Sequence, residues 1–271
     1  MLDRSHEYTR MAEVESTLWW YQALHRLVLG AIRAHATAAD PVVIDAGCGT
    51  GGLMQFLRAH GLRDVRGFDL SEHAVAWCKK RDLDVRQGNL LDIGALHAER
   101  SADVIVSNDT LYFLDRDQQA SVVRQCAAIL RPGGLLILNV PALRAFAGIH
   151  DISVGIRERF SRADTKRLLG GPSFEVVRER YWPFVLSPLI YAARAAQRRT
   201  MRRNKDFTVQ SDVGLPPRWI NNTLLALVRA ENRLLPWKPF GSSLFLVAIR
   251  QPASALSSAA TRSTLASGSS G

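Results

Sequence analysis

The chain has 271 residues, of which 47% are hydrophobic and 22% charged, and its formal net charge is +10 at pH 7. This length and composition predict a substantial core in one large domain, or in one domain that carries a cap. No apolar run reaches the roughly 18 residues that a membrane-spanning helix needs, and the first ten residues lack the apolar stretch of a secretory signal. We therefore expect a cytoplasmic protein without a transmembrane helix.

The first predicted element is a helix over residues 11–39. Its apolar side chains recur at helical spacing, at Leu18, Tyr21, Leu24, Val28 and Ile32. We treat residues 1–40 as one N-terminal helical unit that precedes the first strand.

Residues 41–52, with the sequence PVVIDAGCGTGG, form the next predicted unit. The apolar, β-branched run that ends in Asp45 predicts a buried strand, and the glycines after it predict a tight turn that leads into a helix. Because glycine has no Cβ, a ligand can approach the backbone of such a turn closely. We therefore expect a small polar ligand at this turn.

Two classes of ligand fit the turn. Gly47, Gly49 and Gly52 satisfy the dinucleotide fingerprint G-x-G-x-x-G, and Asp69 follows about 20 residues later, where a ribose-binding acid belongs. Asp45 favours a different ligand, because a carboxylate repels a pyrophosphate but suits the ammonium group of an amino acid. The acid and the glycine spacing together resemble the first motif of the class I S-adenosylmethionine-dependent methyltransferases.

This resemblance extends over roughly residues 40–140. The further matching segments are Val65–Asp69 as a second strand, Val85–Leu90 as a third strand and turn, Asp103–Ser107 as a fourth strand, and Leu130–Pro141 as a helix end, turn and fifth strand. The resemblance implies a Rossmann-like α/β sheet and S-adenosyl-L-methionine as cofactor.

The resemblance also implies the cofactor contacts. Asp45, Gly47, Gly49 and Gly51 would hold the methionine part, with Cys48 as a small side chain that fits the turn, and Asp69 would bind the ribose hydroxyls. Leu70, Asn89 and Leu90 would line the adenine, although relatives often have an aspartate in place of Asn89, and Asn108 would complete the site. If residues 1–40 act as a lid, Trp20 or Tyr21 would cover the cofactor; core packing is the alternative for these aromatic residues.

The polar pair His150 and Asp151 lies in the segment 141–160, which must cross the carboxyl edge of the sheet. A histidine can take the proton of a hydroxyl acceptor, so we expect His150 to act as the general base or to orient the acceptor with Asp151. The alternative is a surface pair without a function, and Tyr112 and Arg159 are lesser candidates. The three cysteines lack metal-ligand spacing, and no carboxylate cluster points to a metal.

Residues 182–241 separate a predicted sixth strand, 174–181, from a seventh, 243–250, and we expect them to form a helical cap. Ten Lys or Arg and three acids give this segment seven of the ten net positive charges of the chain. The charge is compatible with a membrane surface, with an anionic or lipid-linked acceptor, or with a solvated helix face. Nucleic acid is the least favoured partner, because no binding module for it appears.

Together these segments predict an α/β, Rossmann-like, seven-stranded sheet with helices on both faces and a helical cap inserted between strands six and seven. The cofactor-binding domain would comprise residues 41–181 and 242–250, the helix at 221–235 would cover the acceptor site, and residues 251–271 would be disordered. The expected activity is methyl transfer to a hydroxyl or amine of a small-molecule acceptor, such as a natural product, a sugar or a lipid-linked intermediate. The alternatives are a nicotinamide-dependent oxidoreductase and a catalytically silent cofactor-binding protein.

Overall fold

The computed structural model describes residues 5–203 and 214–252 of the chain. The predicted disordered tail lies, apart from Gln251 and Pro252, outside the described residues.

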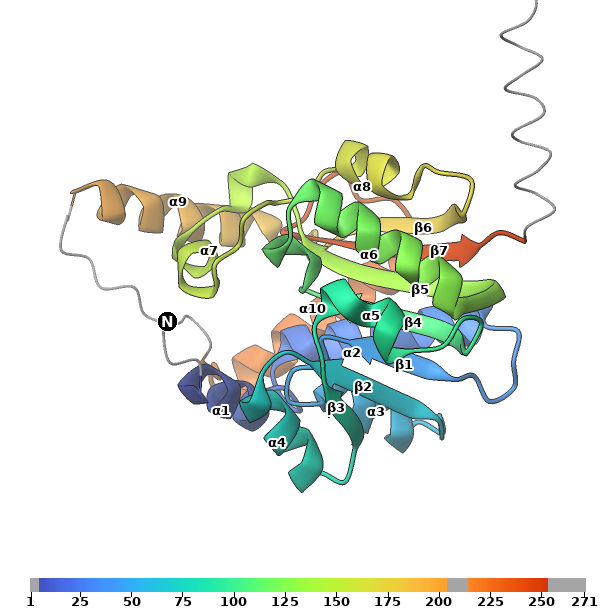
Figure 1. Cartoon of the computed structure of the whole chain (residues 1–271). Coiled ribbons are helices and arrows are strands. Elements are labelled where there is room, and N and C mark those ends of the chain that lie inside the picture. Colours follow the sequence, from blue (N-terminus) through green and yellow to red (C-terminus); the bar gives the residue numbers. More distant parts are fainter. Residues whose placement is uncertain (1–4, 204–213, 253–271) are drawn as a thin grey trace, which may run out of the picture.

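Seven strands form one mixed sheet in the order β3-β2-β1-β4-β5-β7-β6 (Figure 1). The strands are β1 (Val43–Ala46), β2 (Val65–Asp69), β3 (Asp84–Gln87), β4 (Ala102–Asn108), β5 (Leu130–Pro141), β6 (Phe174–Trp182) and β7 (Ser243–Arg250). Only β7 runs antiparallel to its neighbours, β5 and β6. The predicted fold class and the antiparallel pairing of the last two strands are confirmed. From β1 the chain adds strands toward one edge of the sheet, β2 and then β3, and from β4 it adds strands toward the other edge. Ligands of such sheets bind at the carboxyl ends of the strands beside this switch point between β1 and β4.

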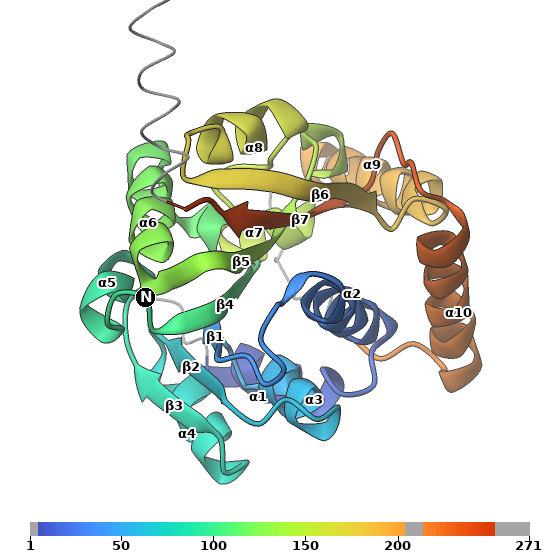
Figure 2. The ribbon, with the colours of Figure 1, turned by 90° about the vertical axis from the view of Figure 1, so that its right-hand side faces the viewer.

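Helices cover both faces of the sheet (Figure 2). They are α1 (Ser5–Val14), α2 (Trp19–His35), α3 (Gly52–Ala59), α4 (Glu72–Lys80), α5 (Ile93–Leu96), α6 (Arg116–Ile129), α7 (Ile149–Val154), α8 (Arg162–Leu169), α9 (Ser187–Arg203) and α10 (Arg218–Leu234), with short 3-10 turns η1 (Leu90–Asp92), η2 (Leu111–Phe113) and η3 (Arg144–Phe146). Successive strand residues alternate between two cores: Val104 and Val106 pack with α2, α3 and α10, whereas Ile105 packs with α5, α6 and α8.

The predicted helix over residues 11–39 is wrong in its extent, because the structure divides it into α1 and α2. The break lies at Glu15, whose buried carboxylate accepts hydrogen bonds from Gly52 N (3.1 Å) and Thr50 Oγ1 (2.7 Å) and pairs with Arg81. This long-range contact ends α1 and fastens it to the N-terminus of α3. A pattern of apolar residues along the helix does not contain that information.

In the chain, the helices α9 and α10 come after β6 and before β7, where the sequence predicted an inserted helical segment. The expectation that residues 221–235 cover the acceptor site is wrong: α10 packs against α2, and none of its described residues lines the cavity described below. Its C-terminal end is held by Glu231, which accepts hydrogen bonds from the backbone of Phe184 and Val185 and forms a buried ion pair with Lys238 Nζ at 3.0 Å.

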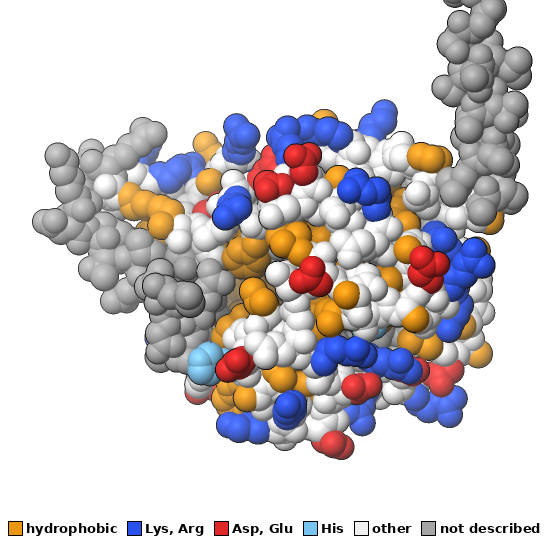
Figure 3. Space-filling model, in the orientation of Figure 1, with side chains coloured by type: hydrophobic (Ala, Val, Ile, Leu, Met, Phe, Trp, Pro, Cys, Tyr) orange, Lys and Arg blue, Asp and Glu red, His pale blue; other side chains and the backbone are white. Residues whose placement is uncertain are grey.

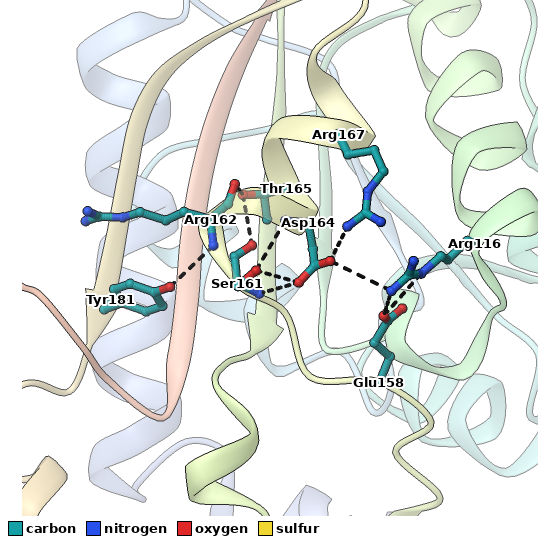
Figure 4. Close-up of polar contacts among 8 residues, drawn as sticks. All are labelled: Arg116, Glu158, Ser161, Arg162, Asp164, Thr165, Arg167 and Tyr181. Atoms are coloured by element: carbon teal, nitrogen blue, oxygen red, sulfur yellow. Dashed lines mark hydrogen bonds and ion pairs between the residues drawn. The ribbon is translucent and has the colours of Figure 1, made fainter.

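A polar network fixes the chain where it returns from the carboxyl edge to the sheet (Figure 4). Ser161 caps α8 in a capping box with Asp164, Arg162 N donates to the Tyr181 hydroxyl, and Arg116 pairs with Glu158 at 2.7 Å. Burial opposes ionisation of Asp164, but the hydrogen bonds from Ser161 and the charge of Arg167 lower its pKa. Ser161 thus fixes the start of α8, and the segment next to Arg159 is anchored.

Candidate functional site

A cavity of about 490 Å³ lies at the carboxyl edge of the sheet, between the glycine turn after β1 and the elements α1, α2, α7 and α9. In Figure 1, α1, α7 and α9 lie on the left of the molecule, and Figure 3 shows hydrophobic side chains around a hollow beside them. The lining joins residues that lie far apart in the sequence, from Glu7 to Ser243.

The glycine turn gives one end of the cavity its shape. Gly47 and Gly49 line it and have φ values of +83° and +54°, which other residues rarely adopt. A Cβ on Gly47 would collide with Thr110, and a Cβ on Gly49 would lie 3.1 Å from the sulfur of Met11 in α1. Gly51 also has a positive φ, +87°, but its neighbours are Leu83 and Cys78, and it does not line the cavity.

Asp69 lies across the turn, at the end of β2. Its Oδ2 accepts a hydrogen bond from Gly49 N and its Oδ1 one from Ser71 N, each at 2.9 Å. Burial raises the pKa of Asp69, while these bonds and one from the Tyr8 side chain oppose the rise. Tyr8, in α1, therefore contacts the Asp69 carboxylate inside the cavity.

Asp45 lines the same end of the cavity, and only 2% of its surface is exposed. Burial, followed by the charges of Asp69 and Glu15, raises the pKa of Asp45 to about 8. A cation next to this carboxylate would stabilise its ionised form. This end of the cavity therefore favours a positively charged group.

Asn108, Trp20 and Cys48 line the cavity as well. The Oδ1 atom of Asn108 is buried and has no hydrogen-bond partner among the residues that the structure describes. Because a buried acceptor without a partner is costly, this atom indicates that a ligand supplies a donor here. Trp20 stacks on Trp182 with ring centroids 5.5 Å apart, so it belongs to the cavity wall and to the core at once.

The residues predicted to line the adenine lie outside the cavity lining. Leu70 is 65% exposed, the Asn89 side chain accepts a hydrogen bond from Leu91 N at 3.0 Å, and Leu90 packs against the core. Their contact with the adenine stays a prediction, as does the contact of Gly51 with the methionine part of the cofactor.

The other end of the cavity is mainly apolar and aromatic, with two guanidinium groups. Its lining residues include Tyr112, Phe113, Phe146, Val154, Ile156, Arg159, Ile190 and Arg194. Asp151 holds Arg159 with two bonds, at 2.6 and 2.8 Å, and Arg159 also donates to Ala142 O at 2.9 Å. The backbone of His150 lies in α7, but its side chain is outside the described part of the structure. The catalytic roles of His150 and Asp151 stay predictions.

The lining residues that were not singled out in the sequence include Tyr8, Glu15 and Asp109. The contacts of Tyr8 and Glu15 span more than 30 residues of sequence and have no local signature. Asp109 directly follows β4, so its place at the carboxyl edge could have been predicted by the reasoning applied to Asp45 and Asp69.

Comparison with known proteins shows what the domain is similar to. The methyltransferase domain family matches residues 44–138. A protein of Mycolicibacterium smegmatis, named "Probable S-adenosylmethionine-dependent methyltransferase", is 31% identical over 163 residues, which are 58% of this chain and 60% of that protein. A ubiquinone biosynthesis O-methyltransferase of Burkholderia ambifaria is 31% identical over 149 residues, which are 49% of this chain and 62% of that protein. The matched part of the chain spans less than two thirds of either relative.

Among solved structures, a magnesium protoporphyrin IX methyltransferase from Synechocystis with bound SAH has a TM-score of 0.52 and 17% identity, and the match covers 85% of this chain and 84% of that one. At this identity the likeness shows the fold. The predicted resemblance to class I methyltransferases is confirmed, and the sequence matches support S-adenosyl-L-methionine as the cofactor.

Proposed function

We propose, from the premise that residues 44–138 form a class I S-adenosylmethionine-dependent methyltransferase domain, that the protein transfers a methyl group to a hydroxyl or amine of a small-molecule acceptor. One observation carries the proposal: a single cavity joins an acidic end, with Asp45 and Asp69 around the glycine turn, to an apolar end with Arg159 and Arg194. The acidic end suits a cationic cofactor, and the apolar end suits an apolar acceptor.

We assign the cofactor contacts at the acidic end. Asp45 would pair with the ammonium group, Asp69 would accept the ribose hydroxyls, and the buried Oδ1 of Asn108 would accept a hydrogen bond from the amino-acid part. The orphaned acceptor and the crowding of Gly47 and Gly49 fit a polar ligand that lies close to the backbone. When bound, S-adenosyl-L-methionine supplies a methyl group on a sulfonium that is already activated for in-line displacement.

With an activated donor, most of the protein's contribution is to place the acceptor at near-attack distance. We assign this task to the apolar end of the cavity. The two-point bond from Asp151 holds the Arg159 guanidinium against the cavity, which supports an orienting role for this pair. His150, which precedes Asp151, would orient the acceptor from α7 or take its proton.

We also propose a peripheral contact of the inserted segment 182–241 with a membrane or a lipid-linked acceptor. Nine of the twelve large hydrophobic side chains that are exposed in the described residues belong to this segment, among them Leu189, Trp219 and Trp237. The basic side chains of Arg198 and Arg199 follow in α9. Exposed apolar groups beside arginines suit an anionic interface. No helix in the described residues is long and apolar enough to cross a membrane.

Vesicle co-sedimentation tests the contact. We expect the protein to sediment with phosphatidylserine-containing vesicles at low salt, less at high salt, and little with neutral vesicles. The Trp237→Glu variant should bind less, whereas Leu70→Glu, a change at an equally exposed leucine outside the segment, should bind like the wild type. Equal loss in both variants would argue against this surface.

Isothermal titration with S-adenosyl-L-methionine, S-adenosylhomocysteine and both redox forms of the nicotinamide dinucleotides tests the cofactor. Micromolar binding of the first pair alone is the expected result, and binding of a dinucleotide alone would support an oxidoreductase instead. Methyl-labelled cofactor, incubated with a panel of phenols, sugars, amines and polyprenyl phenols, then tests turnover by mass spectrometry. Cofactor binding without label transfer to any of them would favour a silent binding protein.

A further inference from the structure

One carboxylate of the cavity is not used by the cofactor assignment and lies between the two ends of the cavity. The carboxylates in its lining are Glu7, Glu15, Asp45, Asp69 and Asp109. Glu15 is paired with Arg81, Asp45 and Asp69 surround the glycine turn, and Glu7 belongs to α1. Asp109 remains, and it is a partly exposed side chain whose surface faces the cavity.

Asp109 lies between the two ends of the cavity. It follows the last residue of β4, the neighbour of β1, and the next residue, Thr110, packs directly over Gly47 of the cofactor turn. On its other side, η2 begins at Leu111 and supplies the aromatic Tyr112 to the apolar end. A group at this junction lies where cofactor and acceptor must meet.

The carboxylate is held in place by the core. Asn139 Nδ2 donates to Asp109 Oδ2 at 2.9 Å, and Asp109 N donates to Asn139 O at 2.8 Å. Asn139 is itself fixed by Trp182 Nε1, which donates to its Oδ1 at 2.8 Å. Asp109 has a φ of +53°, an uncommon conformation that the surrounding contacts must maintain. Such rigid support is typical of side chains whose orientation matters for binding or catalysis.

The surroundings of Asp109 bring its pKa close to neutral pH. Burial raises its pKa to about 7, and the hydrogen bond from Asn139 and the charge of Arg159 partly offset the rise. Tyr21 faces it from α2 and keeps its proton, because burial, Glu15 and Asp109 raise the phenol pKa. The pKa values of Asp45, on the neighbouring strand, and of Asp69 are raised by burial as well, but both carboxylates belong to the cofactor assignment. A base that titrates near neutral pH can both accept a proton and release it.

We propose that Asp109 is the carboxylate at the reacting centre and takes the proton of the acceptor when its oxygen or nitrogen is methylated. This rests on the proposed function. In the step, the bond from the acceptor atom to the methyl carbon forms, the bond from sulfur to that carbon breaks, and the acceptor proton moves to a carboxylate oxygen of Asp109. The sulfonium becomes a neutral thioether, and protonated Asp109 later releases the proton to solvent. His150 then keeps the orienting role.

Proton linkage of ligand binding tests this placement without an identified acceptor. S-adenosyl-L-methionine carries a sulfonium, whereas S-adenosylhomocysteine carries a neutral sulfur and the same ammonium and ribose. A carboxylate beside the sulfonium loses its proton only with the first ligand. Titration calorimetry of both ligands in buffers of different ionisation enthalpy, from pH 6 to pH 8.5, yields the difference in protons released. For the wild type we expect up to about 0.5 proton at pH 7, because about half of Asp109 is protonated there.

The variants decide between outcomes. In Asp109→Asn the difference should vanish while S-adenosylhomocysteine still binds, and Asp109→Glu, which restores a carboxylate, should recover it. Asp117→Asn, an exposed change in α6, should behave like the wild type. A difference that persists in Asp109→Asn, or is absent in the wild type, overturns the placement although the cofactor binds. If neither ligand binds the wild type, the proposed function itself fails.

Discussion

At the scale of single residues, the ribose assignment depends on Asp69. Replacing this carboxylate by alanine removes charge-assisted hydrogen bonds to the ligand, so Asp69→Ala should weaken binding of S-adenosylhomocysteine by about 1.5–3 kcal/mol. Asp64→Ala is the matched control, because Asp64 lies just before the other end of the same strand and pairs with Arg66 on the surface. Titration calorimetry measures both, and equal affinities of the two variants would contradict the assignment.

At the scale of elements, Glu15 joins α1 and α2 to the body of the protein. Glu15→Gln leaves Arg81 without its buried partner, which typically costs about 3–5 kcal/mol. We expect a lower free energy of unfolding in urea and faster amide hydrogen exchange in α1. Glu13→Gln, a change at an exposed acid of the same helix, should leave both unchanged. Unaltered exchange in α1 would show that other contacts hold it.

The corner between β6, α9 and α10 depends in the same way on a buried ion pair. Lys238→Met removes the cation that faces Glu231, and the carboxylate then remains buried with backbone N–H partners only. The free energy of unfolding should fall by about 3–5 kcal/mol in urea denaturation. Arg233→Met, at an exposed position near the end of α10, provides the comparison and should cost much less.

At the scale of the whole molecule, the acidic cavity makes stability depend on pH. The pKa values of Asp45 and Asp109 are raised in the folded state to about 8 and about 7, so each carboxyl binds a proton more tightly there than in the unfolded chain. The stability they contribute is complete below the unfolded pKa and is lost as pH rises through the folded values. Buried His25, whose pKa is lowered to about 3, makes stability depend on pH only below about pH 6.5.

We therefore expect the ligand-free protein to lose stability between pH 6.5 and pH 8.5. Urea denaturation at these two pH values measures the loss. The double variant Asp45→Asn, Asp109→Asn should lose less over the same interval, since two of its titrating groups are gone. A wild-type protein whose stability rises with pH in this window would contradict the raised pKa values.

The sequence by itself determined the fold class and the acidic end of the site. The β-branched runs and the glycine turn are local patterns, and in a parallel sheet local order places Asp45, Gly47, Gly49, Asp69 and Asn108 at one edge. These features follow from the chain because neighbouring residues produce them.

Only the tertiary structure decided how the cavity is closed. The break at Glu15, the contact of Tyr8 with Asp69, and the packing of α10 on α2 all join segments remote in sequence. The support of Asp109 by Asn139 and Trp182 likewise connects three strands. Side-chain hydrogen bonds and ion pairs of this kind depend on the register of packed elements. That register is set by the burial of the whole core, which no single stretch of sequence specifies.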